Sequence, residues 1–141
     1  MTTLFTSPAP MSQTLAATRG PVALWALWAT QVVLAGMFML SGGMKLAGLP
    51  LAVAMFDAVG IGQWFRYATG TIEVVAAAAL LVPFLSPFGA LVMVPTMVGA
   101  IATHLFIIGG SAMPATVLLI GSLAVVWARR DQLAGAWSRL H

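Results

Sequence analysis

The sequence contains no cysteine and only two histidines among its 141 residues. The absence of cysteine excludes disulfide bonds, thiol chemistry, cysteine-bound zinc and a self-contained iron–sulfur cluster. The histidines are His104 and His141, and the second lies at the far end of the chain, so a bis-histidine haem site cannot form within one bundle. No HExxH or EF-hand spacing occurs either. We therefore expect no metal site and no intrinsic cofactor.

Charged residues are also scarce, at 6% of the chain against about 25% in an average soluble protein. Hydrophobic residues make up 61%, and the mean hydropathy is +1.03. This composition predicts an integral membrane protein that contacts the lipid bilayer. The net charge of +3 does not indicate nucleic-acid binding, because the six basic residues are dispersed along the chain.

Four apolar stretches predict membrane-spanning helices. We expect these spans at about residues 22–44, 65–82, 88–108 and 114–128, each bounded by glycine, proline or charged residues. They predict an all-α, integral membrane four-helix bundle over residues 21–128. The preceding residues, 1–20, are rich in threonine and contain two prolines, which is typical of a flexible arm.

The segment between the first two spans is too polar and too interrupted by glycine to cross a membrane. It runs from Leu46 to Trp64, and its apolar residues recur at helical spacing at Leu51, Ala54, Met55 and Ala58. We expect a short interfacial or re-entrant helix here. Such a segment can also act as a lid over a site.

The last residues, 129–141, predict an amphipathic tail. Leu133, Trp137 and Leu140 share one face of a helix, whereas Asp131 and Arg139 lie elsewhere. This pattern is typical of a helix on a membrane surface. A solvated tail is the alternative, because the segment is short for an independent helix.

Basic residues near the span ends predict the orientation. Four spans place both termini on one side, together with Arg19, Arg129, Arg130 and Arg139. The other side has only Lys45 and Arg66. Since lysine and arginine favour the cytoplasmic side, we expect a bacterial cytoplasmic membrane with both termini in the cytoplasm. We expect Arg66 to snorkel to the surface, and Asp57 to be solvated or paired with Arg66.

Glu73 and His104 are the ionisable residues that lie well inside the predicted spans. A charge at bilayer depth costs a few kcal/mol, so each needs a partner, a wet pocket or a changed protonation state. Glu73 lies about 12 Å into span two, and His104 lies about 6 Å from the end of span three. Both therefore share the outer half of the membrane with Lys45. We predict a Lys45–Glu73 ion pair with His104 nearby.

Two interpretations of this group stay open. In the first, Lys45, Glu73 and His104 line a polar pocket that opens to the outer leaflet and exchanges protons with a bound carbonyl or quinone. In the second, Glu73 and His104 only hold the helices together through bonds to Thr71, Thr103 or Gln31. We expect four residues to support the pocket: Gly42, Gly70, Gln31 and Thr103. Gly99 and Thr103 also make a small-xxx-small step that favours close helix packing.

Three short motifs carry a family resemblance. The segment from Gly42 to Leu46 reads Gly-x-x-Lys-Leu, Gly70 to Glu73 reads Gly-x-x-Glu, and Ala100 to His104 reads Ala-x-x-x-His. In this order, over about residues 27–128, the chain resembles the DoxX-like membrane proteins. That family takes its name from the small subunit of an archaeal thiosulfate:quinone oxidoreductase or terminal quinol oxidase. The resemblance implies a link to membrane oxidoreductase complexes and oxidative-stress responses.

These observations favour an accessory or quinone-associated subunit of a membrane oxidoreductase system over a stand-alone enzyme. Its partners would be redox subunits in the membrane, and a homo-oligomer is an open alternative. Two other functions use the same residues. The first is a binding or transport protein for a small lipid-like or neutral solute, and the second is a non-catalytic scaffold.

Overall fold

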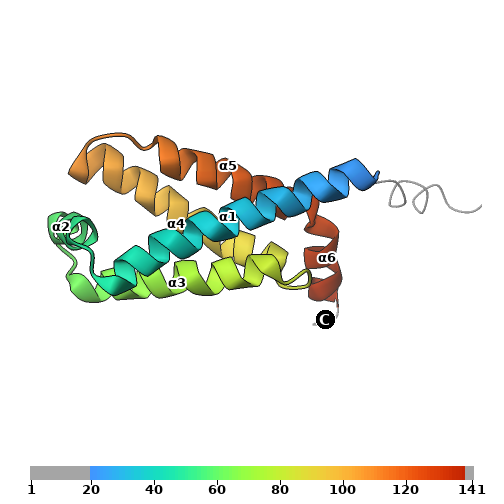
Figure 1. Ribbon diagram of the computed structural model, residues 1–141, viewed down its shortest axis with the longest axis horizontal. Helices are drawn as coiled ribbons and strands as arrows, with labels where there is room; N and C mark the ends of the chain where they lie inside the picture. Colours follow the sequence, from blue (N-terminus) through green and yellow to red (C-terminus); the bar gives the residue numbers. More distant parts are fainter. Residues whose placement is uncertain (1–19, 139–141) are drawn as a thin grey trace, which may run out of the picture.

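The computed structural model describes residues 20–138, which form an all-α fold (Figure 1). Four long helices make up a bundle: α1 (Pro21–Ala47), α3 (Gln63–Leu81), α4 (Ser86–Thr103) and α5 (Met113–Ala128). The last turn of the α4 rod is the π-helix η2 (His104–Ile108), and two short helices, α2 (Pro50–Val59) and α6 (Arg130–Ser138), complete the fold. The predicted four-helix bundle, with a short helix between its first two long helices, is confirmed. The predicted flexible arm up to residue 19 lies outside the described residues, as do Arg139, Leu140 and His141.

The long helices alternate in direction, which gives the bundle two distinct ends (Figure 1). One end holds α2, η2 and the start of α3, and we call it the α2 end. The other holds α6, the start of α1 and the turn between α3 and α4, and we call it the α6 end. The start of α1 and the end of α6, where the described chain begins and ends, both lie at the α6 end. The first and last described helices therefore begin and end on the same side of the bundle.

Small residues allow the helices to pack at close range. The core is built from alanines, methionines and a few larger residues: Leu34, Ala35, Phe38, Ala76, Ala77, Leu80, Ala90, Met93, Met97, Ala115 and Val125. A Cβ on Gly89 of α4 would lie 2.7 Å from the backbone oxygen of Ala76 on α3. A Cβ on Gly121 of α5 would lie 2.9 Å from a methyl carbon of Leu34 on α1. Glycines thus set the spacing of neighbouring helices, as is usual in membranes.

The close packing expected at Gly99 and Thr103 does not occur. Among the described residues, no atom beyond the local helix lies within 4 Å of where a Gly99 Cβ would be. The Thr103 hydroxyl donates instead to the Gly99 backbone oxygen of its own helix, at 2.9 Å. In this fold the small-xxx-small step satisfies a side chain locally and leaves Gly99 exposed.

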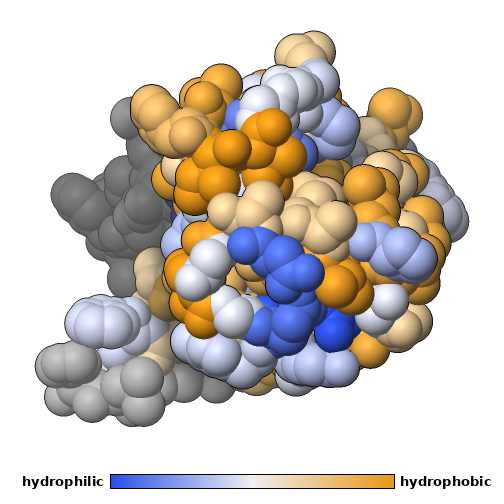
Figure 2. Space-filling view, turned by 90° about the vertical axis from the view of Figure 1, so that its left-hand side faces the viewer, coloured by the Kyte–Doolittle hydropathy of each residue, from blue (hydrophilic) through white to orange (hydrophobic). Residues whose placement is uncertain are grey.

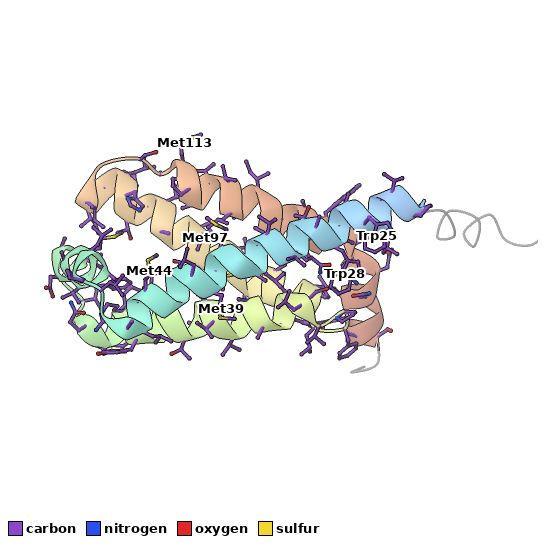
Figure 3. The ribbon with its side chains drawn as sticks, in the orientation of Figure 1. Trp25, Trp28, Met39, Met44, Met97 and Met113 are labelled. Carbon is purple, nitrogen blue, oxygen red and sulfur yellow. The ribbon has the colours of Figure 1, made fainter. Side chains whose placement is uncertain are left out.

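The outer surface of the bundle is apolar. Side chains more than half exposed include Trp25, Val75, Phe106 and Val117. Figure 3 shows Trp25 and Trp28 near the start of α1, at the α6 end, where indole rings suit a membrane interface. The chain is an integral membrane protein whose exposed apolar side chains face lipid.

Length and composition single out some helices as spans more clearly than others. Within the described residues, α1 and the α4–η2 rod are both long enough and apolar enough to cross a membrane. Helices α5 and α6 together add a third span if the 56° bend between them lies within one span. Helix α3 does not meet these criteria, because it carries Arg66 and Glu73. Both of these residues are buried inside the bundle, while Ile72 and Val75 on the same helix are exposed. Helix α3 therefore shows lipid an apolar face that its average hydropathy conceals.

Candidate functional site at the α2 end

One face of α3 carries two charged residues into the bundle. Arg66, Gly70 and Glu73 follow one another at spacings of four and three residues, which places them on one side of the helix. All three are buried. Gly42 and Lys45 of α1, also three residues apart, lie against this face.

Gly42 and Gly70 make room for the charged residues of the opposite helix. A Cβ on Gly42 would lie 3.0 Å from the Glu73 Cβ and 2.7 Å from the Gly70 backbone oxygen. A Cβ on Gly70 would lie 3.0 Å from the Lys45 Cβ and 3.1 Å from the Gly42 backbone oxygen. The arrangement is reciprocal: each glycine faces the ionisable residue of the other helix. The two Gly-x-x motifs therefore determine that Lys45 and Glu73 meet.

The ion pair is close and well satisfied. Lys45 Nζ lies 2.7 Å from Glu73 Oε2 and 2.9 Å from Oε1, and it donates to Ser41 Oγ at 2.7 Å. These three contacts use all the donors of an ammonium group. The Lys45 side chain is 19% exposed and the Glu73 side chain 3%. The predicted Lys45–Glu73 ion pair is confirmed, and it neutralises a carboxylate that lies away from water.

Arg66 does not reach the surface, so the expected snorkelling is wrong. The residue is 4% exposed, and its NH1 group donates to the backbone oxygen of Lys45. Its Cζ lies 4.2 Å from the centre of the Tyr67 ring. The last carbonyl groups of a helix lack intrahelical partners. The guanidinium of Arg66 supplies a donor to one of them at the end of α1, which retains the side chain inside the bundle.

Gln63 connects Arg66 to α2. Its Nε2 donates to the Val53 backbone oxygen at 3.1 Å and to Asp57 Oδ1 at 2.7 Å, while its Oε1 accepts a hydrogen bond from Arg66 Nε. Asp57 is therefore linked to Arg66 through an amide and not by the direct pair considered as one alternative. We call Lys45, Asp57, Gln63, Arg66 and Glu73 the α2-end network. Figure 2 looks onto this end and shows a hydrophilic patch surrounded by apolar residues.

His104 lies at the same end but outside the α2-end network. It begins η2, which contacts α2, and its Nδ1 lies 3.5 Å from the Gly109 backbone oxygen. Within residues 20–138 no hydrogen bond joins His104 to Lys45 or Glu73. The ring is half-buried. Turns of π-helix are rare in proteins, and those that do occur are often found at functional sites.

The chain matches a known family. A model of the DoxX-like family matches residues 29–135, which is most of the chain. The chain belongs to the DoxX-like family. The match includes Lys45, Glu73 and His104, and it extends into α6. No curated protein and no solved structure matches the chain significantly.

Two of the four expected supporting residues adjoin the ion pair in this DoxX-like protein, and two do not. Gly42 and Gly70 contact it directly, as described above. Gln31 is fully buried elsewhere, where its Oε1 accepts a hydrogen bond from Arg129 at 3.0 Å. Along α1 it is about 21 Å from Lys45, at 1.5 Å per residue. The Thr103 hydroxyl bonds within its own helix.

The chemistry open to the site follows from its unused hydrogen-bonding capacity. The Glu73 carboxylate accepts two bonds from Lys45 and retains lone pairs for a further donor. Lys45 can serve a ligand only by releasing Ser41 or Glu73. The second ring nitrogen of His104 makes no hydrogen bond within residues 20–138. The α2 end of the DoxX-like bundle therefore combines an acceptor, an exchangeable cation and an imidazole.

Proposed function

We propose that this DoxX-like membrane protein is an accessory subunit of a membrane oxidoreductase system and binds a quinone at its α2 end. Lys45, Glu73 and His104 are the polar groups of the proposed pocket. The observation that carries the proposal is the Lys45–Glu73 pair, in which a carboxylate only 3% exposed is held inside an apolar bundle. A residue of this kind is a functional-site hypothesis by default.

A quinone suits the chemistry of this end. Its ring and tail partition into lipid, its carbonyl groups accept hydrogen bonds, and the hydroxyl groups of the quinol donate them. Glu73 would accept a hydrogen bond or a proton from the quinol, with Lys45 as counter-charge and His104 as partner for a carbonyl. Oxidation of the quinol also releases two electrons and a second proton. The absence of cysteine and of a second histidine within the predicted spans favours partner redox subunits as the electron acceptors.

Quinone titration tests the proposal. The full-length protein, reconstituted alone and with its membrane partners, is titrated with a ubiquinone or menaquinone analogue. We expect saturable binding that weakens in Glu73→Gln and in His104→Ala. Asp131→Asn, which neutralises an exposed acid on α6, is the matched control and should bind like the unaltered protein. Absence of binding, or equal binding in all four proteins, would overturn the proposal.

The same proposal includes an orientation, with the termini cytoplasmic and the α2 end outside a bacterial cytoplasmic membrane. The lack of native cysteine makes the test direct. Ala58→Cys places an exposed thiol on α2, and Gly135→Cys places one on α6. In intact cells an impermeant maleimide should label the first and spare the second until the membrane is opened. Labelling in the reverse order would invert the orientation.

One observation favours a second candidate, a non-catalytic scaffold. Lys45 already uses all three of its donors within the protein, as a purely structural ion pair would. A scaffold predicts that Glu73→Gln weakens assembly with partner subunits while leaving quinone binding absent in every variant. Co-purification of the partners, measured beside the titration, separates the two functions.

A further inference from the structure

We infer that Arg66 is a positioning residue for the Lys45–Glu73 pair and that, through Gln63, it couples the position of α2 to that pair. The inference rests on the proposed function only where it concerns a ligand. The coupling itself depends on contacts among three helices, and it has a test that needs no quinone.

The first step concerns the end of α1, which Arg66 holds. The helix closes with two bonds from the following turn, Gly48 N–H to Lys45 O and Leu49 N–H to Met44 O, each 3.2 Å. Gly48 has a φ of +69°, a conformation that favours glycine at this position. Arg66 adds a third bond, from NH1 to Lys45 O. The Lys45 carbonyl is thus held by both the turn and α3.

The second step follows from where these bonds fall on Lys45. Arg66 holds its backbone oxygen, and Glu73 holds its ammonium group. Both partners come from the same face of α3, two turns apart. A residue fixed at both ends by one rigid helix has few other positions open to it. Arg66 therefore limits where the Lys45 ammonium can lie relative to Glu73.

The third step is the connection to α2. Gln63 uses both of its amide hydrogens on α2, at Val53 O and Asp57 Oδ1, so its Oε1 is directed at Arg66. If α2 moves away, Gln63 loses these anchors and Arg66 loses a fixed acceptor. A buried guanidinium that loses one of its acceptors is costly, so the side chain would shift toward a new partner and release the Lys45 carbonyl. Displacement of α2 by a ligand or partner would thereby change the ion pair.

Arginine is the residue that this role needs. Its planar group donates in two directions at once, to Gln63 with Nε and to Lys45 O with NH1, and it stacks on the Tyr67 ring. A lysine keeps the charge, but it lacks the forked donors of the guanidinium and stacks less well on an aromatic ring. Arg66→Lys therefore tests positioning apart from charge.

Infrared spectroscopy of the reconstituted full-length protein provides the test. The carboxylate band of Glu73 is assigned by its loss in Glu73→Gln. We expect this band to shift in Arg66→Lys, and also in Gln63→Met, which keeps Arg66 but removes its link to α2. Arg130→Lys, at an exposed arginine of the α6 end, is the control and should leave the band in place.

Each outcome decides part of the inference. An unchanged band in Arg66→Lys would overturn positioning, and a shift in Arg66→Lys without one in Gln63→Met would overturn the coupling to α2. If Arg66→Lys does not fold, Gln63→Met carries the test of the whole connection. If the unaltered protein binds a quinone analogue, both variants should bind it about tenfold more weakly. Loss of a residue that positions a metal ligand weakens metal binding by about 10- to 100-fold, and we expect an effect at the lower end of that range. Failure to bind quinone at all would refute the proposed function and leave the infrared result to decide the coupling.

Discussion

The two ends of the bundle bury polar residues in different ways. At the α2 end, Lys45 and Glu73 are opposite charges in direct contact, and Arg66 reaches Asp57 through an amide. At the α6 end, the contacts of the Arg129 guanidinium include two neutral oxygens, the Gln31 side chain at 3.0 Å and the Pro83 backbone at 3.3 Å. The Gln31 amide nitrogen is buried there without a hydrogen-bond partner among the described residues. The α2 end therefore joins its charges in direct or amide-mediated pairs, whereas the α6 end holds a buried amide nitrogen with no partner among the described residues.

The region between the two ends also distinguishes them. Leu34, Phe38, Leu80 and Met93 are each at most 4% exposed, and the core cluster of the described residues is apolar. This separation predicts that substitutions at one end leave the other intact.

The largest effect is expected from breaking the charge match at the α2 end. Lys45→Met leaves the Glu73 carboxylate buried and unpaired, which should cost about 4 kcal/mol in the free energy of unfolding. Lys45→Met/Glu73→Gln removes both charges and should recover most of this loss. Unfolding in detergent, followed by circular dichroism, measures both variants. A single variant that costs less than the double one would contradict the matched-charge description.

A somewhat smaller effect is expected from the glycine contact beneath the pair. In Gly42→Ala the new Cβ meets the Gly70 backbone oxygen at 2.7 Å, so α1 and α3 must separate, at about 2 kcal/mol. The same helix offers a control, because nothing lies within 4 Å of a Cβ at Gly36 among the described residues. Gly36→Ala should therefore be neutral or slightly stabilising. Equal losses in the two variants would show that the cost arises from the helix itself and not from the contact.

The sequence was sufficient for the helices and for the ion pair, for a physical reason. Apolar stretches of span length determine the long helices, and depth along antiparallel helices brings Lys45 level with Glu73. Its position near the end of a span predicts that Arg66 reaches the surface, and that prediction is wrong. Its helix face was the better signal, since it lies four residues before Gly70 and seven before Glu73. A residue that shares a buried face with a buried acid is a candidate for burial itself.

Contacts between distant helices were harder to predict. Gln31 was grouped with Lys45, although the two are about 21 Å apart along α1. Charge counting places its partner Arg129 at the flank of a span, but it does not say which backbone carbonyls or amides the guanidinium reaches. The bend between α5 and α6 brings Arg129 to the Pro83 carbonyl and the Gln31 amide, and no periodicity along the chain reports such a bend.

The α6 end should tolerate a change that the α2 end does not. Gln31→Leu removes the acceptor of a hydrogen bond from Arg129, but it also removes the buried amide nitrogen that has no partner among the described residues. The two contributions oppose each other, and we expect a net loss of about 1 kcal/mol. The same detergent unfolding measures it beside Lys45→Met. A loss as large as that of Lys45→Met would mean that the two ends depend equally on their polar contacts.

The smallest effect on the free energy of unfolding is expected at Gly99. It tests whether any substitution near the α2 end destabilises the protein, or only one at a contact between helices. Gly99 lies on α4, one turn before Thr103 and close to this end, yet none of the described residues beyond the local helix lies within 4 Å of a Cβ placed there. Gly99→Ala should therefore gain about 0.5 kcal/mol, because alanine loses less backbone freedom in a helix. A loss comparable to that of Gly42→Ala would imply that an unseen partner packs on α4. A small gain in stability would show that substitutions destabilise the α2 end only at the α1–α3 contact that carries Lys45 and Glu73.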